Sequence, residues 1–197
     1  MKGIYSLIDE AIAGELDRLL RDEGVAPTCR VGCCHCCRYK ILINIAEAHT
    51  LARFLRREWS EEQIHDLQTR TRQWHVWEHS LRNRHLSVDM DGTTDLSRDQ
   101  PSCPLLVGGA CSAYAVRPVV CRTHFVTSPP RGCQAAIHPE STGGAPVTLV
   151  SFVTASNRYS EAIRSHIEGA GMEFSRTQML LPDWLAMEMG WDFAPMR

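Results

Sequence analysis

The first cysteine segment, CRVGCCHCC at residues 29–37, restricts this chain more than any other feature of its sequence. It holds five of the nine cysteines, and the other four follow at much wider spacing. The nine are Cys29, Cys33, Cys34, Cys36, Cys37, Cys103, Cys111, Cys121 and Cys133. Thiols held so close together either oxidise to disulfides or share a soft metal. The function of this protein therefore depends on whether its cysteines form disulfides or bind a metal.

The N-terminal residues indicate whether disulfides or metal sites are to be expected. Acidic residues at four positions between 9 and 17 interrupt the region that would be apolar in a secretory signal peptide. No apolar run in the sequence approaches the length that spans a bilayer. We therefore expect a cytoplasmic protein with no membrane partner, where thiols stay reduced. Under those conditions, metal or redox chemistry is expected of the cysteines before a disulfide framework.

The length and the net charge of the chain limit which folds and which partners are possible. The chain has 197 residues, enough for one ordinary domain that needs no disulfides to fold. Its formal net charge of -2 gives no general electrostatic footprint for nucleic acid. We expect a single domain over residues 1–197 whose partner is a metal ion or cluster, together with a protein partner or substrate.

Apolar side chains recur at helical spacing along most of the chain, which predicts a mostly α fold. The sequence SEEQ at residues 60–63 resembles a capping box and should begin a long polar helix. Residues 39–45 fit either a strand or the entry to a helix. The other expected helices cover residues 4–22, 46–59, 147–164 with an extension to 169, and 182–189.

The remaining segments predict irregular structure around the cysteines. Residues 87–102 and 141–146 are rich in turn-forming residues and are predicted loops. Proline and glycine also break up residues 103–133, except for a short helix expected after Pro118. We therefore divide the chain into a cysteine-cluster metal-binding region, an inserted helical pair, and C-terminal helices. The cysteine-cluster region covers residues 25–135, and the helical pair inserted within it covers about residues 46–86. The C-terminal helices cover residues 147–197.

The spacing of the cysteines favours more than one simple metal site. Thiolate is a soft ligand that selects zinc, iron-sulfur clusters or copper(I). Cys33 and Cys36 form a CxxC pair, whereas the later cysteines are separated by 7, 9 and 11 residues. The adjacent thiols of Cys36 and Cys37 point in different directions and seldom bind one tetrahedral ion together. Eight cysteines would fill two four-thiolate sites and leave Cys34 over, which is one partition among several.

Several motifs together carry a family resemblance. They are CRVGCCHCC, the pair Glu47-Ala48, CPLL at 103, CSAY at 111 and RPVVCR at 117–122. Over about residues 25–135 the chain resembles the YkgJ-like cysteine-cluster family of zinc- or iron-chelating domains, which has a CxxCxxCC signature. The resemblance implies that the shared cysteines ligate metal. Carried over to this sequence, they are Cys29, Cys33, Cys36, Cys37, Cys103, Cys111, Cys121 and Cys133. Here the first gap holds three residues instead of two, and Cys34 is extra.

Wide and irregular ligand spacing favours an iron-sulfur cluster, of the 4Fe-4S type, over zinc, which is the alternative cofactor. Basic residues flank the cysteines and would offset the negative charge of thiolates. They are Arg30, Arg38, Lys40, Arg117, Arg122 and Arg131. His35 and His124 are alternative ligands that could each replace a cysteine.

Three functions fit these features. The first is a metal-binding protein that uses its centre for electron transfer or metal handling. The second is a cluster-dependent enzyme such as a protein-modifying transferase, because similar cysteine modules occur in flagellin lysine methylases. The third is a zinc-stabilised adaptor with an apolar surface, for which Trp184 and Trp191 are candidates. We expect the first, since the ligands are visible in the sequence and no nucleotide-binding loop or nucleophile elbow is.

Overall fold

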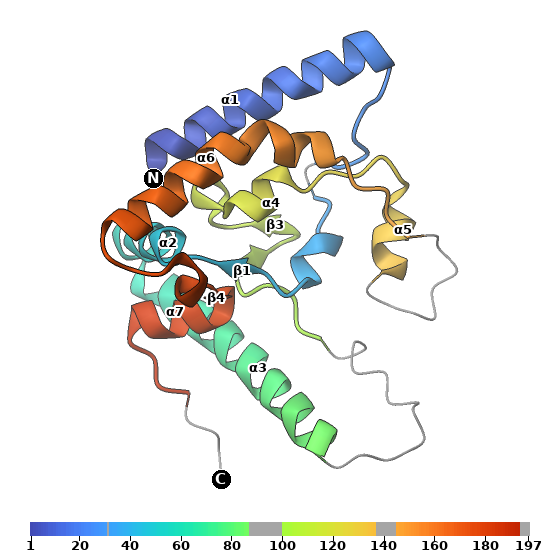
Figure 1. Cartoon of the computed structure of the whole chain (residues 1–197). Coiled ribbons are helices and arrows are strands. Elements are labelled where there is room, and N and C mark those ends of the chain that lie inside the picture. The colour runs from blue at the N-terminus through green and yellow to red at the C-terminus, as the bar shows by residue number, and fades with distance from the viewer. Residues whose placement is uncertain (31, 87–99, 137–144, 194–197) are drawn as a thin grey trace.

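Helices dominate the structure, as their apolar periodicity predicts. The computed structural model describes residues 1–30, 32–86, 100–136 and 145–193 (Figure 1). Within these residues the α-helices are α1 Lys2–Arg18, α2 Ile45–Glu58, α3 Glu61–Leu86, α4 Val119–Thr123, α5 Pro130–Ala135, α6 Val150–Gly169 and α7 Leu181–Met189. The strands are β1 Leu42–Ile43, β2 Leu106–Val107, β3 Ala110–Cys111 and β4 Met179–Leu180. The shorter turns are η1 Leu19–Glu23, η2 His35–Arg38, η3 Tyr114–Val116 and η4 Phe174–Thr177.

The first helix packs along α6, which is far away in sequence (Figure 1). It buries Tyr5, Ile8 and Ile12, whose spacing gives the helix one apolar face. The helix continues into the π-helical turn η1 and stops at Gly24, which adopts the left-handed conformation with φ 64°. The sequence therefore predicted this helical segment, over residues 4–22.

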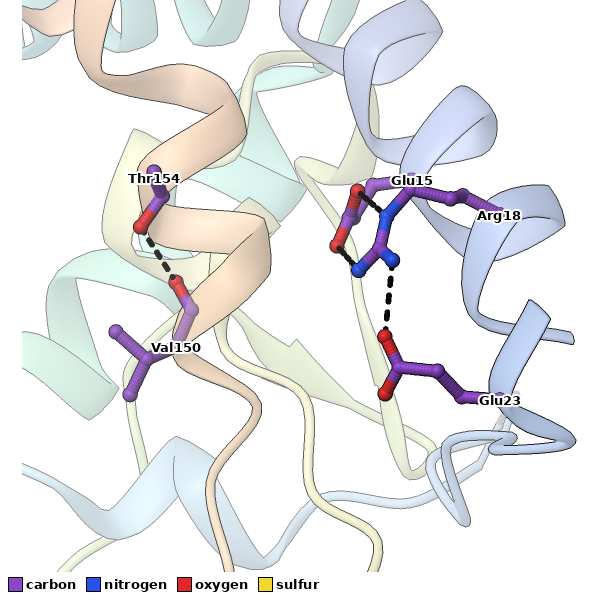
Figure 2. Close-up of polar contacts among 5 residues, drawn as sticks. All are labelled: Glu15, Arg18, Glu23, Val150 and Thr154. Carbon is purple, nitrogen blue, oxygen red and sulfur yellow. Dashed lines mark hydrogen bonds and ion pairs between the residues drawn. The ribbon is translucent and has the colours of Figure 1, made fainter.

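Arg18 joins the end of α1 to the turn that follows it (Figure 2). Its guanidinium donates two hydrogen bonds to Glu15, at 2.9 and 2.8 Å, and one to Glu23 at 2.9 Å. These hydrogen bonds lower the pKa of Glu15. In the same view, the Thr154 hydroxyl donates to the Val150 carbonyl at 3.3 Å in the first turn of α6.

The starts of α2 and α3 are each fixed by a capping box. At α2 the Asn44 side chain accepts from the backbone N–H of Glu47 at 3.1 Å, and the Glu47 carboxylate accepts from the backbone N–H of Asn44 at 3.2 Å. At α3 Ser60 and Gln63 exchange the same pair of bonds, as predicted. The buried Glu47 also accepts from the backbone N–H of Val119 at 2.8 Å, so α2 holds the start of α4.

Residues 39–45 contain both a strand and the entry to a helix, which were the two alternatives predicted for this segment. They form β1 and then lead into α2. Strand β1 pairs antiparallel with β4, with Leu42 opposite Leu180. The indole N–H of Trp184 in α7 donates to the Ile43 carbonyl at 3.0 Å. The C-terminal helix is thereby attached to the start of α2, and Trp184 lies in the core.

Residues 103–133 contain more regular structure than the sequence suggested. Strands β2 and β3 form a hairpin whose two turn residues are Gly108 and Gly109, with φ of 57° and 79°. Positive φ at both positions matches the twist of a two-residue hairpin turn, which glycine adopts without strain. Of the predicted loops, residues 87–99 and 141–144 lie outside the described residues.

None of the helices in the described part of the chain combines the length and the apolar character that crossing a bilayer requires.

We expect Leu55→Ala to destabilise the fold by about 2–5 kcal/mol, because the buried side chain leaves a cavity among tightly packed neighbours. Leu55 is fully buried on α2, at the centre of the main core. Urea denaturation would measure the free energy of unfolding. The matched control is Val76→Ala on α3, where the side chain is 53% exposed and the expected change is within about 0.5 kcal/mol. Equal losses in both variants would contradict the proposed core.

Candidate metal centre

The first cysteine segment folds into a tight turn that ends in η2. The backbone N–H of Cys33 donates to the Arg30 carbonyl at 2.9 Å, and that of Cys37 donates to the Cys34 carbonyl at 3.0 Å. Gly32 has φ of 88°, a conformation that a side chain would strain. The turn therefore depends on glycine at this position as well as on its cysteines.

Backbone bonds hold the later cysteine segment against both ends of this turn. The N–H of Cys103 donates to the Cys37 carbonyl at 2.6 Å. At the other end, the N–H of Thr28 donates to the Val126 carbonyl at 2.8 Å, and the N–H of Val126 donates to the Cys29 sulfur at 3.4 Å. Helix α5, which carries Cys133, packs against η2. Cysteines more than a hundred positions apart in sequence are thus gathered into one region.

Four thiols form what we call the first thiol set: Cys29, Cys33, Cys36 and Cys133. Burial raises the pKa of Cys133, and the negative charges of the other three members raise it further. The pKa of Cys29 is raised by burial and then by the charges of Cys33 and Cys36. Three members therefore come from one short turn and the fourth comes from α5.

Four other thiols form the second thiol set: Cys37, Cys103, Cys111 and Cys121. Burial raises the pKa of Cys103 to about 12, and the charge of Cys111 adds to this effect. Burial also raises the pKa of Cys121, as do the charges of Cys103 and Cys111. Each member comes from a different element: η2, the segment before β2, β3 and α4.

The adjacent cysteines of η2 join the two sets. A hydrogen bond between the two side chains raises the pKa of Cys37 and lowers the pKa of Cys36 to about 7. The charge of Cys36 also acts on every member of the second set. Cys34 is not among the charges that act on the thiols of either set. The arrangement thus resembles the two-site partition that left Cys34 over.

The two cysteine-bearing stretches contain basic residues and no acidic ones. Between residues 25 and 46, and again between 100 and 138, the sequence has six lysines and arginines and no aspartate or glutamate. Burial raises the pKa of Cys111 and Cys121, and the charge of Arg117 opposes this effect at both. Positive charge beside the thiols favours the thiolate form that binds metal.

Arg122, one of these six basic residues, is buried and connects two parts of the fold. Its side chain is 1% exposed and donates to both carboxylate oxygens of Asp9 at 2.6 and 2.7 Å. It also donates to the carbonyls of Ala115 at 2.6 Å and Arg117 at 2.9 Å, and it lies 4.3 Å from the ring centre of Tyr5. The neighbour of Cys121 in sequence is therefore tied to α1.

The sequence could not show this connection. Neither Asp9 nor Tyr5 carries a motif, and they lie more than a hundred residues from Arg122. Arg122 itself was part of the motif RPVVCR, and Glu47 belonged to the Glu47-Ala48 pair. Those motifs were the available signal, although they did not indicate what the side chains contact.

His124 and His35 differ in their surroundings. The Nε2 atom of His124 is buried and has no hydrogen-bond partner in the described part of the chain. Burial lowers the pKa of His124, and its ring meets that of Tyr39 edge to face at 5.7 Å between centres. His35 lies in η2, between Cys34 and Cys36.

The donors fit a thiophilic metal. All nine cysteines are free thiols, and eight of them belong to the two sets. Among the described residues, no three histidine, cysteine or carboxylate side chains are arranged to hold an ion without rearrangement. Metal binding would therefore require these side chains to rearrange.

Comparison with known proteins agrees with this chemistry. A family model named CxxCxxCC, described as "Putative zinc- or iron-chelating domain", matches residues 28–137. The matched segment includes all nine cysteines. No curated protein and no solved structure matches the chain.

Proposed function

Since the matched segment covers more than half of its length, this chain belongs to the CxxCxxCC family, and we propose that its two thiol sets each hold a 4Fe-4S iron-sulfur cluster for electron transfer. The family assignment supports metal binding through the cysteines. What supports the finer proposal is that eight of the nine thiols act on one another's pKa, in two groups that share the influence of Cys36.

The positions of the cysteines in the fold favour iron-sulfur clusters over zinc. Structural zinc sites commonly take pairs of ligands from tight knuckles. The second thiol set takes each ligand from a different element, and the first takes three from one turn and one from a distant helix. Closely spaced cysteines with a remote partner are typical of cluster-binding proteins. Such clusters supply one-electron redox chemistry when bound.

The residues around the thiols suit that role. The thiols of Cys103 and Cys121 in the second centre are half-buried, and Arg117 would offset the negative charge there. A cavity beside Cys37 and Cys103, lined also by Lys40 and Trp74, has room for about one water molecule. A space of this size favours electron transfer over the binding of a substrate at that position.

The adaptor hypothesis required an exposed apolar surface at Trp184 and Trp191. Trp184 is 6% exposed and Trp191 packs against the main core, so these rings do not form an apolar docking surface. The likeness to YkgJ-like proteins in particular, and the division into a cysteine region at 25–135 with α2 and α3 inserted, remain part of our proposal.

We expect protein purified without oxygen and without a metal-binding tag to be brown. It should contain about eight iron atoms and about eight labile sulfides per chain, four of each per cluster. Elemental analysis, a sulfide assay and the visible spectrum would measure this. Colourless protein with about two zinc ions per chain would contradict the clusters and leave a structural metal protein. Protein without metal and with few free thiols would contradict metal binding altogether.

A further inference from the structure

Three segments that are far apart in the sequence meet beside the first cysteine segment. The backbone N–H of Thr28 donates to the Val126 carbonyl at 2.8 Å, and the Thr28 hydroxyl donates to the Ser128 carbonyl at 2.6 Å. The backbone N–H of Val147 donates in turn to the Ser128 hydroxyl at 3.1 Å. These bonds bring the start of the cysteine turn, the approach to α5 and the approach to α6 together. Figure 1 shows α5 and the start of α6 at the same end of the molecule.

Two valine side chains on these segments face solvent. Val147 is 59% exposed, and Val150 in the first turn of α6 is 66% exposed. In Figure 2 the Val150 side chain points away from the pair that Glu15 and Arg18 form on α1. Isolated exposed apolar side chains are ordinary, whereas neighbouring ones rimmed by polar residues mark interaction sites. The residues that surround the two valines therefore decide what this surface can bind.

The surroundings of the valines carry positive charge. Arg30 is exposed at the start of the cysteine turn, and Arg131 is exposed in the first turn of α5. Neither arginine takes part in an ion pair within the described residues. At the end of α1, which packs against α6, the carboxylates of Glu15 and Glu23 are both bonded to Arg18. The two arginines thus keep their charge available to a partner.

This surface adjoins the first thiol set. The Arg30 carbonyl accepts from the backbone N–H of Cys33 at 2.9 Å, and Arg131 lies two residues before Cys133 on α5. Helix α5 packs against η2, which carries Cys36. Since the cysteines of the turn are only half-buried, a cluster bound there would lie close to solvent. Electrons cross only short distances between redox centres, so a redox partner has to dock at such a point.

We infer that Arg30, Arg131, Val147 and Val150 form the docking surface for an acidic protein that carries single electrons. One electron passes between the cofactor of this partner and the cluster of the first thiol set, so one is oxidised as the other is reduced and no bond forms or breaks. The inference rests on the proposed function, because it names the partner of the electron transfer proposed there. Complementary charge speeds the encounter of two proteins, and a small interface with an apolar centre suits a short-lived redox complex.

An acidic flavodoxin is the probe, and titration calorimetry measures its binding to the metal-loaded protein as purified. We expect binding at about 20 mM salt that weakens about tenfold at about 200 mM salt, because ions screen the charges. Arg30→Gln combined with Arg131→Gln should weaken binding about tenfold at the lower salt concentration and remove most of the salt dependence. Val147→Ser combined with Val150→Ser should weaken binding by a similar factor at both salt concentrations, because the lost contact is apolar.

Arg57→Gln and Val76→Ser are the matched controls. Their side chains are 61% and 53% exposed on α2 and α3, and neither change should alter the affinity or its salt dependence. No binding at low salt, or equal affinity in the wild type and both double variants, would overturn the inference. The salt dependence of the wild-type protein tests it even where a variant fails to fold. An oligonucleotide that binds more tightly than flavodoxin, through the same arginines, would overturn it in favour of nucleic acid.

Iron, sulfide and zinc per chain are measured on the same samples. Iron-sulfur protein that does not bind flavodoxin would overturn the docking surface alone and leave the proposed clusters in place. Zinc-loaded protein would contradict the clusters, and with them the electron transfer, whether or not flavodoxin binds. Failure of the further inference and failure of the proposed function are therefore separate results.

Discussion

Cys121→Ser should lose about half of the bound metal, while Cys34→Ser should keep all of it. Cys121 supplies the second thiol set from α4, and serine is a poor ligand for a soft metal. Cys33→Ser should lose the other half, because it removes a member of the first set. Loss of a bound metal that supports the fold removes several kcal/mol of folding free energy, so both variants should also unfold at lower urea concentration.

The measurement is iron, sulfide and zinc per chain in the three variants, with the free energy of unfolding of each. Cys34→Ser is a close control because its thiol lies in the same turn and belongs to neither set. Full metal content in Cys33→Ser and Cys121→Ser would show that the assigned thiols are not ligands. Loss of all metal in either variant would contradict two separable centres.

Arg122→Met should destabilise the protein by about 2–6 kcal/mol, since two carbonyls lose their donor at about 1–3 kcal/mol each, which is a large fraction of the stability of a typical domain. Methionine fills much of the same volume but donates no hydrogen bonds. The change leaves the carbonyls of Ala115 and Arg117 without their buried donor and removes the ion pair with Asp9. Since α4 carries Cys121 next to this residue, the second centre should also lose metal more readily to a chelator.

Asp9→Asn is the matched variant for the charge of that ion pair. Asp9 is 52% exposed, so water screens its charge and the expected loss is only about 1 kcal/mol. Urea denaturation of the metal-loaded proteins would compare the two. If Arg122→Met and Asp9→Asn were equally mild, the buried guanidinium would not be the anchor of α4.

Local patterns predicted the helices well, because an apolar face at helical spacing is written in neighbouring residues. The capping box predicted at Ser60 and Gln63 formed for the same reason, since its hydrogen bonds join residues only three positions apart. Gly108 and Gly109 of the β2–β3 hairpin are among the glycines from which irregular structure was predicted over residues 103–133. A pair of glycines between two short extended segments is itself a hairpin signal.

The composition of the thiol sets could not be predicted in the same way. It depends on the bond between Cys103 and Cys37 and on the packing of α5 against η2, both of which join distant parts of the chain. The sequence therefore indicated that the cysteines bind metal and how many sites they could fill, but not which cysteines belong together. The contact between Arg122 and Asp9 is long-range for the same reason.

The contacts of α1 and β1 with elements that come much later in the sequence have a consequence for biosynthesis. Helix α1 packs against α6, and β1 pairs with β4, so both have partners that follow all nine cysteines in the sequence. A ribosome delivers Cys133, the last of the nine thiols, before any residue of α6 or β4. A nascent chain therefore has all nine thiols, and the α4 partner of its first helix, before α6 has been made. On the proposal that these thiols bind metal, the centre can be loaded before α6 and β4 complete the packing around α1 and β1.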